Sequence, residues 1–211
     1  MMQRYKNILF SCVLACASAL SAPAATWVPS LDVTTDKACY APGQTVTFKA
    51  VGTMPANTNI RYRHGSAVVE TAWLTPSSWT WTPPTADYQG YMAELFTTAA
   101  DGTETIVGTI AVDVSSQWTR FPRYGFVADF DNHQGTVDKN ANIKTEMAYL
   151  NRLHINGVQF QDWQWKHHKP VRFEANGSLT QWYQDISNRW VGVEYVKNYI
   201  AEQHKYGMKS I

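Results

Sequence analysis

The densest group of chemically capable side chains lies between residues 158 and 170, where the sequence runs VQFQDWQWKHHKP. Asp162 ends a short strand-like segment, and Trp163, His167 and His168 come soon after it. A carboxylate and imidazoles can hydrogen-bond to sugar hydroxyls, while indole rings cover the apolar face of a pyranose. We therefore predict Asp162, Trp163, His167 and His168 as the substrate-binding residues of a carbohydrate site.

This segment has two other interpretations. In the first, the adjacent histidines and the carboxylate bind zinc; however, neighbouring imidazoles in an extended loop point apart, and no third His or Cys stands at ligand spacing. We therefore predict no metal. In the second, Asp162 only caps the loop and Lys169-Pro170 only turns the chain.

The segments around this motif alternate between strand and helix patterns. Residues 123–128 and 158–160 are expected as buried strands, and residues 138–153 carry apolar side chains at helical spacing. A second helix contains Val193, Val196 and Ile200, ends near Gly207 and leads into a strand that starts at Met208. This order is the repeating unit of a parallel α/β fold.

A barrel fits this repeat better than a dinucleotide-binding fold. No glycine-rich phosphate loop follows either expected strand, so no cofactor is predicted. Polar and aromatic residues gather instead after the strands, where barrels carry their active sites. Since a complete barrel takes about 250 residues, we expect residues 119–211 to form the incomplete start of an α/β (β/α)8 TIM barrel.

Short alternating runs separated by turn residues fill residues 26–116. They amount to about seven strands, the size of an immunoglobulin-like β-sandwich, so the predicted chain is multi-domain, an all-β sandwich followed by the barrel. An exposed row of Trp73, Trp79 and Trp81 would bind sugar. The spacing of Trp79 and Trp81 instead places both on one strand face, which usually packs inside.

Residues 1–25 are typical of a signal peptide. Arg4 and Lys6 precede an apolar stretch that is too short to span a bilayer, and small residues before Ala25 fit a cleavage site. The surroundings of Cys16 also resemble a lipoprotein cleavage box, which leaves a lipid anchor at Cys16 open. We expect an exported protein without a membrane span, whether secreted, periplasmic or a surface lipoprotein.

Charge and cysteine content limit the partners and the chemistry. The 18 Lys and Arg residues nearly balance 17 Asp and Glu residues, so no net field attracts nucleic acid. Of the 3 cysteines, Cys12 and Cys16 lie in the leader, which excludes a disulfide framework. Cys39 remains, and we expect it to be a small buried hydrophobe in a strand-like segment rather than a reactive thiol.

The site motif carries a family resemblance. Residues 155–163, followed by Lys-His-His-Lys-Pro at 166–170, resemble the second strand and loop of glycoside hydrolase family 66, which contains bacterial dextranases and cycloisomaltooligosaccharide glucanotransferases. Residues 36–43 and 123–126 extend the resemblance to both halves of the chain. Gln161 departs from it, because family members often carry Tyr at that position.

The resemblance implies an immunoglobulin-like domain, a catalytic (β/α)8 barrel and a further β-domain. It also implies an exported endo-acting glycosidase, monomeric when complete, that cleaves α-1,6 bonds of dextran-type α-glucans with retention. That mechanism needs two carboxyl groups about 5 Å apart, which the family takes from later strands. We therefore assign no catalytic residue to Asp129, Asp131 or Asp162, and expect this chain alone to be inactive.

Three alternatives stay open. The chain could be a non-catalytic surface glycan-binding protein that uses its sandwich, a structural sandwich that spaces an enzyme from the membrane, or a truncated, inactive glucanase.

Overall fold

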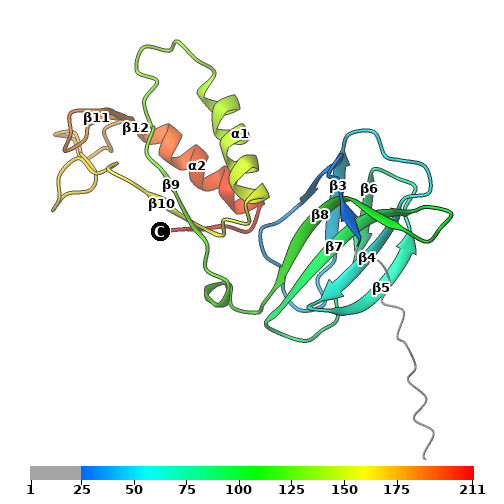
Figure 1. Cartoon of the computed structure of the whole chain (residues 1–211). Coiled ribbons are helices and arrows are strands. Elements are labelled where there is room, and N and C mark those ends of the chain that lie inside the picture. The colour runs from blue at the N-terminus through cyan, green and yellow to red at the C-terminus, as the bar shows by residue number, and fades with distance from the viewer. Residues whose placement is uncertain (1–24) are drawn as a thin grey trace, which may run out of the picture.

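The computed structural model describes residues 25–211 and divides them into two parts (Figure 1). The first part consists of strands alone, and the second combines a parallel sheet with two helices. The predicted leader, including Cys16, lies outside the described residues. None of the described helices is long and apolar enough to cross a membrane.

The first part is a β-sandwich of two sheets. A five-stranded sheet runs in the order β1-β8-β7-β4-β5, and a three-stranded sheet runs β2-β3-β6. The sequence suggested about seven strands; the additional one is the two-residue β1, which pairs parallel to β8. The strands are β1 (Thr26–Trp27), β2 (Asp32–Thr35), β3 (Val46–Val51), β4 (Asn59–His64), β5 (Ala67–Trp73), β6 (Ser78–Trp81), β7 (Gln89–Thr98) and β8 (Glu104–Val114).

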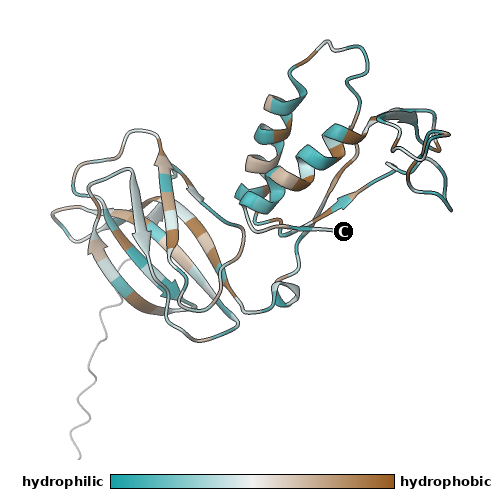
Figure 2. Cartoon of the chain, turned by 180° about the vertical axis from the view of Figure 1, so that it is seen from behind, coloured by the Kyte–Doolittle hydropathy of each residue, from teal (hydrophilic) through white to brown (hydrophobic). Residues whose placement is uncertain are grey.

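Alternation along the strands builds the core of this sandwich, as the hydropathy colouring of Figure 2 shows. Along β3, buried residues alternate with exposed ones from Val46 to Val51. Trp79 stacks on Phe48 with ring centroids 5.1 Å apart, and Trp81 stacks on Tyr62 at 4.0 Å. The prediction that Trp79 and Trp81 pack inside is confirmed; Trp73, at the end of β5, is 70% exposed.

The second part confirms the predicted alternation of strands and helices. Its three-stranded sheet has the order β13-β10-β9, with all pairs parallel. A hairpin, β11–β12, lies between β10 and α2, where the sequence analysis places no strand. The elements are the short 3-10 helix η1 (Trp118–Arg120), β9 (Tyr124–Val127), α1 (Lys139–Arg152), β10 (Gly157–Phe160), β11 (Trp182–Gln184), β12 (Trp190–Gly192), α2 (Val193–Lys205) and β13 (Lys209–Ser210).

The two helices cover one face of the parallel sheet. Asp138 caps α1 by accepting a hydrogen bond of 3.0 Å from the amide of Ala141. Apolar residues of α1 and α2 form one buried cluster with the sheet residues Val127, Val158 and Phe160. Tyr124 and Phe126 alternate with these along β9 and remain 58% and 63% exposed on the opposite face.

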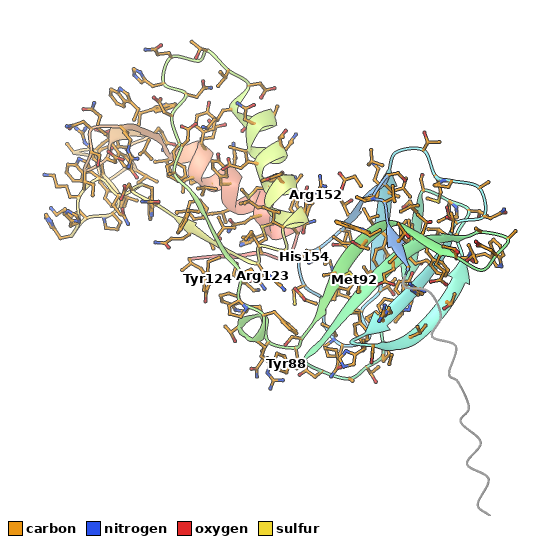
Figure 3. The ribbon with its side chains drawn as sticks, in the orientation of Figure 1. Tyr88, Met92, Arg123, Tyr124, Arg152 and His154 are labelled. Carbon is orange, nitrogen blue, oxygen red and sulfur yellow. The ribbon has the colours of Figure 1, made fainter. Side chains whose placement is uncertain are left out.

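Polar contacts join the two parts (Figure 3). His154 Nδ1 lies 3.3 Å from the carbonyl oxygen of Ala38, Arg152 pairs with Asp32, and Arg123 pairs with the buried Asp113. Burial lowers the pKa of His154 below its ordinary value, although the carboxylate of Asp113 acts in the opposite direction. The imidazole is therefore held in its neutral form within the junction.

Cys39 lies beside this junction and differs from the expectation. It stands just before the isolated bridge residue Tyr40, outside any strand, and it is half-buried rather than fully buried. Burial is the main cause that raises the pKa of its thiol, and the nearby carboxylate of Asp113 adds to the effect. The thiol is therefore less acidic than that of an ordinary exposed cysteine.

Candidate functional site

The loop after β10 folds into a tight turn that presents the two histidines. The amide of Trp165 donates to the carbonyl of Pro170 at 2.9 Å, and Lys166 and Lys169 exchange two hydrogen bonds of 3.0 Å. His167 and His168 occupy the tip of this turn and are exposed. The loop was expected to be extended at this point, and the turn shows that expectation to be wrong.

Tyr183 of β11 anchors this loop from below. Its buried hydroxyl donates to the carbonyl of Trp163 at 2.8 Å, with a longer contact of 3.5 Å to the carbonyl of Pro170. Burial raises the pKa of Tyr183 to about 12, so the hydroxyl keeps its proton and remains a donor. Trp163 and Trp165 are partly buried and pack against the same core cluster.

Asp162 is held in an unusual backbone conformation at the end of β10. Its φ of +52° lies in the left-handed region, which only a few non-glycine residue types such as Asp tolerate. One carboxylate oxygen of Asp162 lies 3.0 Å from the guanidinium of Arg189. A hydrogen bond to Asp185 raises the pKa of Arg189 above its ordinary value, so the guanidinium is a permanent cation.

A pocket of about 480 Å³ opens beside the turn. The Lys166 ammonium lies 4.5 Å from the centre of the Trp165 ring, and the Arg172 guanidinium lies 5.7 Å from it. Aromatic surface next to hydrogen-bond donors suits the mixed apolar and hydroxylated surface of a sugar. The pocket is lined by Trp165, His168, Lys169, Pro170, Val171 and Phe173.

The structure brings only some of the predicted site residues together. His168 lines the pocket, and Trp165, which stood within the motif, contributes its aromatic wall. Trp163 packs toward the core, while Asp162 faces Arg189 and lies outside the pocket lining. The motif is therefore divided between a pocket and a neighbouring ion pair.

The carboxylates after β9 are engaged in local structure. Asp129 pairs with the buried ammonium of Lys139 at 2.6 Å. Asp131 accepts a hydrogen bond of 2.7 Å from the amide of His133, whose ring stacks on Trp190 with centroids 4.2 Å apart. Among residues 25–211, no group of three or more His, Cys, Asp or Glu side chains is arranged to hold a metal ion.

Three residues of this site were not predicted from the sequence: Tyr183, Asp185 and Arg189, all on the β11–β12 hairpin. A signal for the hairpin was present, because Trp182-Tyr183 and Trp190-Val191 flank the turn-forming Ser187-Asn188. Each strand holds only three residues, which is too short for a clear alternation.

Comparisons with known proteins agree on one family. The family model described as Glycosyl hydrolase family 66 matches residues 35–211. Two cycloisomaltooligosaccharide glucanotransferases of Niallia circulans are each 28% identical to the chain, over 85% and 82% of its length. These matches cover 19% and 18% of the two relatives, so the chain spans about a fifth of their length.

A solved structure gives the same result. The cycloisomaltooligosaccharide glucanotransferase of Paenibacillus sp., complexed with cycloisomaltoheptaose, has a TM-score of 0.70 and 28% sequence identity to the chain. The match covers 88% of this chain and 27% of that enzyme.

Proposed function

Because the chain belongs to glycosyl hydrolase family 66, we propose that it is part of an exported glycoside hydrolase or transglycosylase acting on α-1,6-linked glucans of the dextran type. The enzyme works with retention through two carboxyl groups, and its partner is an α-glucan polysaccharide or oligosaccharide. The relative complexed with cycloisomaltoheptaose supports this class of ligand.

In the proposed architecture, residues 26–116 are an immunoglobulin-like domain and residues 119–211 supply the first strands of a (β/α)8 barrel. The strand order β9-β10-β13 supports it, because neighbouring strands in a barrel follow one another along the chain. The exposed faces of Tyr124 and Phe126 support it as well, since bulky side chains fill a barrel interior.

The observation that carries the proposed function is the pocket at the carboxyl end of β10, walled by Trp165 and Phe173 with His168 at its rim. Barrel enzymes bind their substrates at this end of the sheet. We assign the pocket to a pyranose ring, with Trp165 as the stacking surface and His168 as a hydrogen-bonding group. Asp162, Trp163 and His167 complete the proposed substrate-binding set.

None of the strand-end carboxylates is proposed as nucleophile or general acid. A retaining pair needs one carboxylate free to attack and one carboxyl group able to give up a proton. Asp129 is tied to Lys139, and Asp162 is tied to Arg189. Their proposed roles are therefore to orient substrate or loops.

Affinity electrophoresis in gels that contain dextran tests the proposal. The unaltered protein should be retarded, and Trp165→Ala should weaken binding about tenfold, because it removes the stacking surface. His168→Ala should weaken it less. Unchanged retardation in both variants, or no retardation of the unaltered protein, would contradict the proposal.

The exposed ring of Trp73 favours one other candidate, a glycan-binding surface on the sandwich. Trp73→Ala is the matched control, since it removes an equally large aromatic ring from the other part of the molecule. Retardation that depends on Trp73 and not on Trp165 would favour a non-catalytic glycan-binding protein.

A further inference from the structure

The turn between β11 and β12 is held rigidly by one buried carboxylate. Asp185 Oδ1 accepts hydrogen bonds from the amides of Ser187 at 2.8 Å and Arg189 at 2.9 Å. The amide of Asp185 also donates to the carbonyl of Arg189 at 2.8 Å. This network fixes the backbone from which the Arg189 side chain extends.

The same carboxylate also fixes the Arg189 guanidinium. Asp185 Oδ2 lies 2.8 Å from both Nε and a terminal nitrogen of Arg189. That terminal nitrogen also lies 3.0 Å from Asp162 Oδ2 and 3.5 Å from the Asp162 carbonyl oxygen. Arg189 therefore bridges a buried carboxylate on the hairpin and a half-buried carboxylate on the loop.

Asp162 needs such a partner because its backbone is strained. A φ of +52° is unfavourable for a residue with a Cβ and persists only where the surroundings enforce it. Arg189 contacts both the main chain and the side chain of Asp162, so it can hold the residue and aim its carboxylate together.

We infer that Arg189 is a positioning residue of the glucan site, which fixes the Asp162 carboxylate at the end of β10 so that it accepts a hydrogen bond from a pyranose hydroxyl. This inference rests on the proposed function and deepens it, because it names the group that makes Asp162 a rigid acceptor. Asp185 acts with Arg189 as the buried anchor.

A double-mutant cycle on the full chain tests this, with isomaltotriose as the probe and calorimetric titration as the readout. Asp162→Asn keeps a residue that tolerates the left-handed backbone but removes the carboxylate charge. Asp162→Asn and Arg189→Gln should each weaken binding about tenfold. The double variant should bind no more weakly than Asp162→Asn alone, because Arg189 acts only through Asp162.

Controls separate positioning from loss of structure. Arg152→Gln removes a guanidinium that is as exposed as that of Arg189, at 47% against 46%. Because Arg152 pairs with Asp32 far from the loop, this variant should leave isomaltotriose binding unchanged. If Arg189→Gln does not fold, Arg189→Lys replaces it in the cycle. The lysine ammonium would keep the charge but could not bridge two carboxylates in the same way.

The outcomes distinguish this inference from the proposed function. Additive losses in the double variant would mean that Arg189 acts independently of Asp162 and would overturn the inference. Binding that depends on Trp165 but not on Asp162 would also overturn it, while the proposed function would stand. If the unaltered chain does not bind isomaltotriose, the proposed function fails and the inference fails with it.

Discussion

The side-chain amide of Asn151 donates a hydrogen bond of 2.7 Å to the main-chain carbonyl of Thr35, 116 residues earlier, and so ties α1 to β2 of the sandwich. His154 and Arg152 contact the sandwich from the same end of α1. Because these contacts are polar, the junction depends on hydrogen-bond geometry and on protonation more than on apolar burial.

We expect Asn151→Ala to lower the free energy of unfolding by about 1 kcal/mol, because it leaves the buried carbonyl of Thr35 without its donor. The loss stays modest because Asn151 Oδ1 is itself buried without a partner, and the substitution removes that cost. Urea denaturation measures the difference. Asn198→Ala, which breaks an exposed bond to Asn140, serves as control and should change stability by less than about 0.5 kcal/mol.

His154 should make the junction sensitive to acid. Because burial lowers its pKa below 6.5 when folded, the unfolded chain takes up the proton first, and stability present at neutral pH declines as the pH falls below about 6.5. The groups that face the imidazole are Asp113, Arg123 and the carbonyl of Ala38. Asparagine tolerates the left-handed φ of +56° at this position and does not take up a proton. The variant His154→Asn should therefore lose less stability at low pH.

Urea denaturation at pH about 7.5 and about 5 compares the two proteins. Parallel losses of stability in the unaltered protein and in His154→Asn would show that other groups cause the acid sensitivity.

Tyr183→Phe should loosen the site loop without unfolding the protein. The carbonyl of Trp163 loses its donor, at a cost of about 1 kcal/mol, and the turn beneath the histidines loses its anchor. Hydrogen exchange of the amides of Trp165 and Lys169 should become faster. The control is Tyr195→Phe, because the hydroxyl of Tyr195 accepts a hydrogen bond from Asn132 instead. This variant should leave the exchange rates of the two amides unchanged.

Ionisation of the Tyr183 hydroxyl should lower the stability of the protein at high pH. Burial raises the Tyr183 pKa to about 12 from a usual value of 10.0, so its contribution is complete below pH 10.0 and is lost as the pH rises toward 12. Burial also raises the pKa of Tyr62 to about 12, so the comparison is with Tyr183→Phe, whose alkaline decline should be smaller.

Gly157→Ala should destabilise the parallel sheet by about 1–3 kcal/mol, because β10 is its central strand and the new Cβ would lie 2.9 Å from both the Tyr124 ring and Ile211 Cδ1. Gly90→Ala on β7 is the matched control, since a Cβ there meets nothing within 4 Å. Thermal unfolding measures both variants. Equal melting temperatures for the two would show that the side chains of Tyr124 and Ile211 move aside freely.

The elements that could be predicted from sequence are those whose pattern is local. Ile143 and Met147 recur at helical spacing. Asp138 marks the start of α1 and Gly207 follows the end of α2, and both signals depend only on neighbouring residues. The predicted helix at 138–153 therefore matches α1 closely.

The partners of the site residues could not be predicted in the same way. Arg189 lies 27 residues beyond Asp162, and they meet only because the β11–β12 hairpin folds back over the loop. Phe173 joins His168 at the pocket through the conformation of a loop without periodic pattern. The closeness of Asp162, Trp163 and His168 in sequence suggested one cluster of side chains, whereas the folded backbone directs these side chains to different places.

The two parts of the molecule differ in the order in which their strands find partners. In the parallel sheet, β10 pairs with β9 and β13 then pairs with β10, so each strand adds to the one before it as the chain emerges. In the sandwich, Thr26 of β1 pairs with Thr105 of β8. The strand β1 therefore has no partner until nearly the whole sandwich sequence has been synthesised. Vectorial emergence thus favours stepwise growth of the parallel sheet, whereas the five-stranded sheet of the sandwich can add its first strand only after its last strand has emerged.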